Sequence, residues 1–156
     1  MQLLAFTVAG QDYAIESRRV VEVLPLVPAR PLPLAPDYVR GVFTYRGRFV
    51  PLVDLGLRLA AGPLHERLST RVIVADLAPP GGEPRLLGIA AENVISICST
   101  DEADSSFPSL EMPAAPFLGR ILRIGGRTLQ VISVEHILPA DVSAGLFPPV
   151  VPAEQP

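Results

Sequence analysis

The chain has 156 residues, a formal net charge of −3 and 49% apolar residues. This apolar content excludes a chain that is disordered along its whole length, and the length fits one domain or two small lobes that share a core. All basic side chains are arginines, and they are scattered along the sequence. Nucleic-acid-binding proteins usually carry clustered positive charge, so no nucleic-acid partner is expected.

Further classes are excluded by particular residues. No apolar run reaches the ~20 residues of a membrane span, so membrane insertion is not expected. The single cysteine, Cys98, cannot form an internal disulfide and suits the cytoplasm. His65 and His136 lack partners at metal-ligand spacing, so no metal site is expected. Gly81-Gly82 lacks the lysine of a phosphate loop, and no catalytic constellation is visible, so neither a cofactor nor enzymatic activity is predicted.

The first half of the chain predicts two strand pairs separated by a proline-rich loop. Residues 3–15 read as strand, turn and strand, with the turn at 10–12. Ser17 can cap a short helical or turn segment over 17–24. Prolines mark 25–36 as a loop. A β-hairpin is predicted over 39–55, because Arg46-Gly47 suits a two-residue turn.

The second half predicts a similar series. Residues 70–77 read as a strand and 85–100 as a second one, with a Pro-Gly loop between them. A long loop is expected over 101–116, followed by a hairpin over 117–138 with Gly125-Gly126 as its turn. The proline-rich segment 141–156 reads as a mobile tail.

An internal repeat relates the two halves. With an offset of 79 positions, Ile121–Val134 aligns with Val42–Leu55, so that Gly126-Arg127 falls on Gly47-Arg48. With an offset of 74, Leu87–Cys98 aligns with Tyr13–Leu24. Two blocks in the same order indicate a duplicated unit, with repeats over about 3–60 and 70–138. Sheets of four or five short antiparallel strands, roughly the number expected per repeat, commonly curl into barrels.

The order of these blocks resembles the CheW family of bacterial chemotaxis coupling proteins. The likeness extends from Leu3 to about Leu138 and rests on four segments. The most specific segment combines a glycine, an Arg-Gly pair and an apolar run that contains Pro and Asp-Leu. The four segments are YAIESRRVVEV, APDYVRGVFTYRGRFVPLVDL, LLGIAAENVISI and FLGRILRIGGRTLQVISVEHIL.

This resemblance implies a mainly β fold of two SH3-like, five-stranded barrel lobes with short helical turns, forming one domain over 1–140. It implies a non-catalytic adaptor that bridges the cytoplasmic tip of a chemoreceptor and the regulatory domain of a CheA-type histidine kinase. Such an adaptor is cytoplasmic and associated with membrane receptor arrays. The partner-binding residues that the resemblance implies are Val20, Glu22, Gly41, Arg46, Gly88 and Ile89.

Some positions depart from the family pattern. Thr44-Tyr45 stands where the family usually has Asn-Leu, and Glu92 and Ser133 stand near positions where it often has aspartate. These departures favour a specialised pathway, such as surface sensing or pilus motility.

Two interpretations of Arg46 remain open, a solvated turn residue or a fork for a partner carboxylate. The alternative function is a small β-barrel module that binds a small ligand or nucleic acid.

Overall fold

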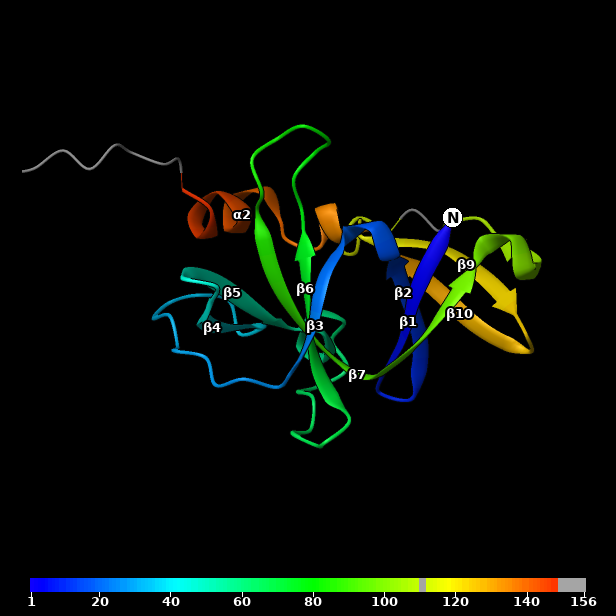
Figure 1. Cartoon of the computed structure of the whole chain (residues 1–156), viewed down its shortest axis with the longest axis horizontal. Helices are drawn as coiled ribbons and strands as arrows, with labels where there is room; N and C mark the ends of the chain where they lie inside the picture. The colour runs from blue at the N-terminus through cyan, green and yellow to red at the C-terminus, as the bar shows by residue number, and fades with distance from the viewer. Residues whose placement is uncertain (110–111, 149–156) are drawn as a thin grey trace, which may run out of the picture.

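The computed structural model describes residues 1–109 and 112–148. Two β lobes lie side by side, and the long strand β7 runs from one into the other (Figure 1). The elements in chain order are β1 (Gln2–Val8), β2 (Gln11–Glu16), η1 (Ser17–Arg19), β3 (Val20–Pro25), β4 (Val39–Tyr45), β5 (Arg48–Asp54), α1 (Leu55–Arg58), β6 (Thr70–Asp76), β7 (Leu86–Ser99), η2 (Thr100–Glu102), β8 (Ala103–Phe107), β9 (Leu118–Ile124), β10 (Arg127–Ile132), η3 (Val134–His136) and α2 (Ala140–Leu146).

The lobes exchange strands between the two halves of the sequence. Lobe 1 consists of β3, β4, β5, β6 and the first part of β7, whereas lobe 2 consists of β1, β2, the last part of β7, β8, β9 and β10. The strand β3 directly follows β2 but pairs with β6 of the other lobe. In the same way, β7 pairs with β6 at its beginning and with β1 at its end. The two repeats therefore interlock and do not form separate barrels.

The strand register reproduces both offsets of the sequence repeat. The hairpin β4–β5 pairs Val39 with Val53, and the hairpin β9–β10 pairs Leu118 with Ile132, 79 residues later in both strands. A register shift follows this pair in both hairpins. The parallel pairing of β5 with β7 at Leu52 and Gly88 likewise corresponds to that of β10 with β2 at Val131 and Ala14. The predicted pseudo-repeat and the mainly β fold are confirmed.

Turn residues explain why both hairpins form at these positions. Arg46 and Gly47 have φ angles of 48° and 76°, and Gly125 and Gly126 have φ angles of 57° and 78°. Two consecutive positive φ values give a turn whose twist matches that of the flanking strands. Glycine adopts such values readily, whereas an arginine there carries a local cost of order 1 kcal/mol.

One apolar core joins the lobes, and a smaller one fills lobe 2. The main cluster includes Phe6 and Ile15 of lobe 2 together with Leu52 and Ile73 of lobe 1. Arg58 adds a polar link between the lobes, because it donates to the Ile137 carbonyl at 2.7 Å and its guanidinium lies over the rings of Tyr38 and Phe117. These contacts hold the lobes in one arrangement.

Three predicted segments differ from the structure. Residues 20–25 form the strand β3 and not a helical turn, because their β-branched side chains pack on β6 and only 17–19 coil. Residues 103–107 form β8 within the predicted long loop, since they pair with β9. The predicted tail instead begins with α2, because Val142, Leu146 and Phe147 pack against the main core. Residues 149–156 of that tail lie outside the described residues. In the part of the chain that the structure describes, no helix is long and apolar enough to span a membrane.

Candidate partner-binding surface

Three side chains from two segments meet at the tip of the β4–β5 hairpin. The Glu22 carboxylate on β3 accepts a hydrogen bond of 2.6 Å from the Tyr45 hydroxyl. The same oxygen, Oε1, lies 2.7 Å from the Arg46 guanidinium. This guanidinium also lies over the Tyr45 ring, 5.1 Å from its centroid. We call Glu22, Tyr45 and Arg46 the hairpin cluster.

The hairpin cluster remains accessible from solvent. The Arg46 side chain is 70% exposed and that of Glu22 is 38% exposed. An exposed ion pair contributes little to stability, about 0–1 kcal/mol. A guanidinium held at a fixed place beside a carboxylate is nevertheless well suited to read charged groups on another protein. Accessibility and fixed geometry make this cluster a candidate for recognition.

An apolar strip adjoins the cluster on the edge strand β3. Val21 and Val23 are 45% and 37% exposed. The register shifts between Val20 and Glu22, so Val21 lies in a β-bulge. Bulges re-aim side chains, and here Val21 lines a shallow groove of about 270 Å³ together with Tyr45, Arg46, Arg48 and Leu86. Charge, aromatic surface and the exposed Val21 therefore meet at one groove.

Phe49 adds a further exposed apolar group to the hairpin. Its side chain is 81% exposed, and it follows Arg48, which lines the groove. Within β5 the next residues, from Val50 to Asp54, are all buried. The exposed Phe49 ring therefore adds apolar area to the candidate surface at the hairpin.

The hydrogen bond from Tyr45 to Glu22 and the desolvation of the phenol make the hairpin cluster sensitive to alkaline pH. The pKa of Tyr45 is raised above 10.0, first because its hydroxyl donates to Glu22 and second because it is desolvated. Ionisation would place a phenolate against a carboxylate. The hydrogen bond is therefore fully present below pH 10.0 and is lost as the pH rises through the raised pKa.

We expect Glu22→Gln to bring the pKa of Tyr45 back towards its ordinary value. Phenolate absorbance should be followed during alkaline titration, with a Tyr45→Phe variant subtracted to isolate this one tyrosine. Tyr13 and Tyr38 serve as internal controls, because burial is the largest cause of their raised pKa values and neither contacts Glu22. An unchanged Tyr45 pKa in Glu22→Gln would contradict the assigned hydrogen bond.

Three of the predicted site residues lie in the interior and not on the surface. Ile89 is 1% exposed in the middle of β7. Gly88 is buried, and a Cβ there would come within 2.6 Å of the Phe43 ring. Gly41 is buried as well, and it faces the Arg30 carbonyl. Core packing covers these three positions, so they are not part of the accessible surface, and their role in partner binding stays a prediction.

Two of the other three predicted residues meet at the surface. Glu22 and Arg46 form the ion pair of the hairpin cluster. Val20 belongs to the same strand as Glu22, but it is partly buried and packs against the main core. Val20 therefore positions β3, whereas Glu22 and Arg46 remain candidates for contact.

Sequence reasoning missed Tyr45 and Phe49, and it took Val21 and Val23 for residues of a helical or turn segment that more often lie in the core. Val21 and Val23 alternate with Glu22, a period of two that would have exposed them if the segment had been assigned to a strand. No local pattern indicates the bond from Tyr45 to Glu22, since the two residues are 23 positions apart in the sequence.

No group of three potential metal ligands comes together in the region covered by the structure.

Comparisons with known proteins agree with this architecture. A family model described as "CheW-like domain" matches residues 2–142. The chemotaxis protein CheW of Rhizobium meliloti is 27% identical over 143 residues, which cover 90% of this chain and 88% of that protein. The chemotaxis protein CheW of Klebsiella aerogenes is 26% identical over 145 residues, with coverage of 92% and 84%.

A solved structure supports the fold assignment. The crystal structure of the scaffolding protein TtCheW from Thermoanaerobacter tengcongensis superposes with a TM-score of 0.76 at 20% identity, covering 90% of this chain and 89% of that one. The fold and the repeated register thus define a mainly β protein of two interlocked lobes, with a charged and apolar surface exposed at the β4–β5 hairpin. Because the family model spans nearly all of the described domain, the chain belongs to the CheW-like domain family.

Proposed function

We propose that this protein is a non-catalytic adaptor of chemosensory signalling, which couples a chemoreceptor to a CheA-type histidine kinase. Membership of the CheW-like domain family supports the scaffold role. The observation that carries the assignment of a site is the hairpin cluster, where Glu22 and Arg46 meet on an accessible hairpin beside exposed valines. The regulatory domain of the kinase and the cytoplasmic tip of the receptor are the partners, and the protein acts at receptor arrays.

The mechanism requires a rigid bridge. A protein that holds two partners at once raises their effective concentration and sets their relative geometry. A conformational change in the receptor can then alter kinase activity through a coupling free energy of about 1–3 kcal/mol. The shared core and the interlobe contact of Arg58 with the Ile137 carbonyl supply the rigidity that such coupling needs.

The hairpin cluster also supports a specialised pathway. Tyr45 occupies a position where the resemblance implies leucine, and its hydroxyl binds the Glu22 carboxylate at 2.6 Å. A leucine could not make this bond. The carboxylate that a partner meets is therefore shared between two internal donors, Tyr45 and Arg46. A partner matched to this arrangement differs from one matched to an unshared carboxylate.

Replacing Arg46 with alanine tests the proposed site. We expect the free energy of unfolding to change by less than about 1 kcal/mol, because the lost ion pair is exposed. We expect affinity for the kinase regulatory domain or the receptor fragment to fall by about tenfold or more, as for a residue central to an interface. Binding should be measured by titration calorimetry with each purified partner, and receptor-dependent kinase activity in a reconstituted complex.

Arg127→Ala is the matched control. Arg127 forms an exposed ion pair with Asp12 at 3.1 Å beside the corresponding hairpin of lobe 2. Its loss should leave binding to either partner within about twofold. The exchange variant Glu22→Arg/Arg46→Glu keeps an internal ion pair while reversing both charges. If the exchange variant bound both partners like the wild type, Arg46 would only fix the conformation of the hairpin. If Arg46→Ala retained full receptor-dependent kinase control, the site assignment would fail.

A further inference from the structure

Arg58, the last residue of α1, lies where the two lobes meet. The helix α1 follows β5 of lobe 1, but the Arg58 side chain contacts both lobes. Its Nε donates at 2.7 Å to the carbonyl of Ile137, which comes directly after η3. Its guanidinium lies 5.0 Å from the ring centroid of Tyr38, just before β4, and 4.4 Å from that of Phe117, just before β9. One guanidinium therefore contacts an element of each lobe.

The residues that Arg58 contacts are related to each other and to Arg58 by the internal repeat. At an offset of 79, Tyr38 corresponds to Phe117, and Arg58 itself corresponds to Ile137. Arg58 thus contacts both members of one equivalent pair and the backbone of its own counterpart. Such contacts are made only where the two repeats face each other, so Arg58 lies at the centre of the interlobe junction.

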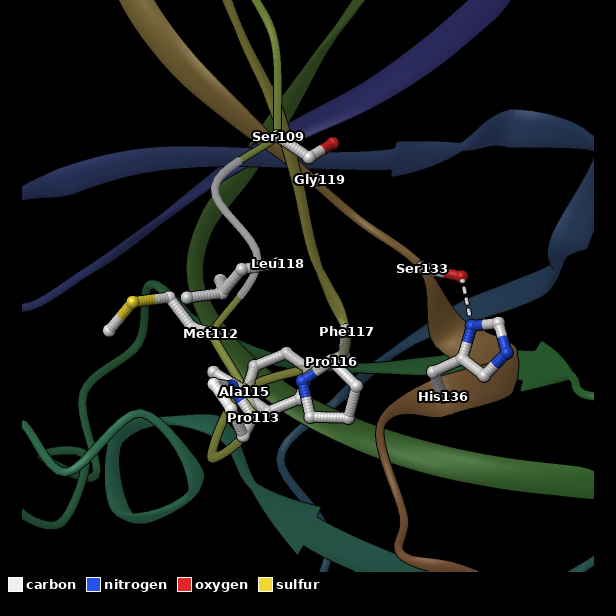
Figure 2. A pocket seen from close by; sticks show the side chains of 10 residues that line it. All are labelled: Ser109, Met112, Pro113, Ala115, Pro116, Phe117, Leu118, Gly119, Ser133 and His136. Carbon is white, nitrogen blue, oxygen red and sulfur yellow. Dashed lines mark hydrogen bonds between the residues drawn. The ribbon is translucent and has the colours of Figure 1, made fainter.

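The backbone that holds the two rings is the same in both lobes. The Asp54 amide donates to the Tyr38 carbonyl at 2.8 Å, and 79 residues later the Ser133 amide donates to the Phe117 carbonyl, also at 2.8 Å. The Ser133 hydroxyl in turn lies 3.0 Å from Nδ1 of His136 in η3 (Figure 2). Each ring is therefore tied to the hairpin of its own lobe and moves with it.

The junction is not symmetric, because only the first repeat supplies a charged side chain. The equivalent residue of the second repeat, Ile137, has no exposed surface and belongs to the main core. Two guanidinium groups at a common centre would repel each other, whereas one donor and one carbonyl acceptor attract. The asymmetry thus selects a single donor–acceptor pair, and with it one relative orientation of the lobes.

The shared apolar core fixes this orientation less strictly than Arg58 does. Hydrophobic attraction has no direction, so the core resists separation of the lobes more than it resists their rotation. A hydrogen bond weakens steeply when its angle changes, and a planar guanidinium stacks on an aromatic ring in few arrangements. Arg58 therefore adds the directional contacts that the core lacks.

A second arginine near the boundary makes a looser connection between the lobes. Arg19 in η1 donates at 2.7 Å to the carbonyl of Ala78, which follows β6 of lobe 1. Its contact with Glu135 in η3 is an ion pair of 3.9 Å, and the Glu135 side chain is 39% exposed. Because an exposed ion pair of that length is weak, it constrains the orientation of the lobes little.

We propose that Arg58 is the positioning residue of this adaptor, which fixes the orientation of lobe 1 relative to lobe 2. The inference rests on the proposed function, because an adaptor transmits a change in the receptor only if its two lobes keep a fixed relation. The hairpin cluster lies at the opposite end of the β4–β5 hairpin from α1. Loss of Arg58 therefore leaves binding to each partner intact and impairs the coupling between them.

Residual dipolar couplings test the orientation of the lobes without any partner. The isotopically labelled full-length protein should be aligned in a dilute medium, and the amide couplings of each lobe fitted separately to the structure. In the wild type, both lobes should give one alignment tensor. Arg58→Met keeps an apolar chain but loses the donor and the planar cation, so its lobes should give two different tensors. A common tensor in folded Arg58→Met would overturn the proposal.

Two further variants distinguish positioning from general destabilisation. Arg71→Met is the matched control, because Arg71 donates to the carbonyls of Thr70 and Leu68, its near neighbours in the chain. It should keep one tensor even if it lowers stability. Arg58→Lys retains a donor for the Ile137 carbonyl but not the planar group between the rings. This milder variant should fold and give two tensors that differ less than those of Arg58→Met, and a single tensor would contradict the proposal.

The effect on coupling is measured with the partners of the proposed function. Arg58→Met should bind the kinase regulatory domain and the receptor fragment within about twofold of the wild type, yet lose receptor-dependent kinase control by at least about fivefold. Arg71→Met should retain control. Full control by a variant whose lobes give two tensors would overturn the proposal. Failure of the wild type to bind either partner would instead refute the proposed function, while the dipolar couplings would still decide the role of Arg58.

Discussion

Gly41→Ala is expected to prevent stable folding, or to lower the free energy of unfolding by at least about 3 kcal/mol. Gly41 has a φ of 139°, a conformation that side-chain-bearing residues rarely adopt. A Cβ there would lie 1.9 Å from the Arg30 carbonyl oxygen. Both neighbours of this contact are backbone, so neither can rotate away.

The consequence of this clash extends to the hairpin cluster. The amides of Arg30 and Val42 donate to each other's carbonyls at 2.8 and 2.9 Å, which ties the proline-rich loop to β4. Any movement of β4 away from Arg30 also moves Tyr45 at its end. Gly41 therefore supports the candidate surface from the interior, where it is buried.

Gly10→Ala separates the cost of a positive φ from the cost of the clash with the Arg30 carbonyl. Gly10 also has a positive φ, 77°, but a Cβ there would meet no atom within 4 Å. Its replacement should cost about 1–2 kcal/mol, the price of the backbone conformation alone. Chemical denaturation of both variants measures the difference. Equal stability of Gly41→Ala and Gly10→Ala would show that the contact with Arg30 has no energetic weight.

The second large effect is expected for Asp54→Ala, a loss of about 3–5 kcal/mol in the free energy of unfolding. The fully buried Asp54 carboxylate pairs with Arg40, caps α1 through the Leu57 amide at 3.1 Å and anchors the Leu64 amide. Its removal leaves the Arg40 guanidinium, 23% exposed, without its buried partner, and it frees two backbone donors.

Ser133→Ala provides the matched control for this variant. Ser133 occupies the equivalent position in lobe 2, where its hydroxyl lies 3.0 Å from Nδ1 of the exposed His136 ring. We expect a change within about 0.5 kcal/mol. The double variant Arg40→Met/Asp54→Leu should recover much of the stability lost in Asp54→Ala, because replacing both partners of a buried ion pair by apolar groups is often nearly neutral. If Asp54→Ala unfolded at the same denaturant concentration as the wild type, the capping role of Asp54 would be refuted.

The difference between Asp54 and Ser133 also bears on how the two lobes have diverged. In lobe 1 the buried Asp54 carboxylate stabilises the fold, because it pairs with Arg40 and anchors the segment of the buried Leu64. In lobe 2 the equivalent Ser133 has a hydroxyl instead, which lies 3.0 Å from the His136 ring.

Much of the local structure could be read from the residues alone. The two hairpins were predictable because Arg46-Gly47 and Gly125-Gly126 permit the backbone of a tight turn, and turn chemistry acts over a few residues. The repeat was visible because each offset preserves the alternation of apolar residues that a strand needs to bury one face. Errors arose at 17–24 and 103–107, where the strand forms only because a distant edge, β6 or β9, is available for pairing.

The sequence by itself thus determined the class of fold, the duplicated unit and the polar hairpin that carries Arg46. Only the tertiary structure decided that β3 and β7 cross between the lobes and that Tyr45 shares Glu22 with Arg46. The physical reason is the sequence separation of the residues involved. Tight turns and the alternation of apolar residues along a strand depend on residues that are close in the sequence. Strand exchange and a shared carboxylate depend instead on which distant segments reach the same place.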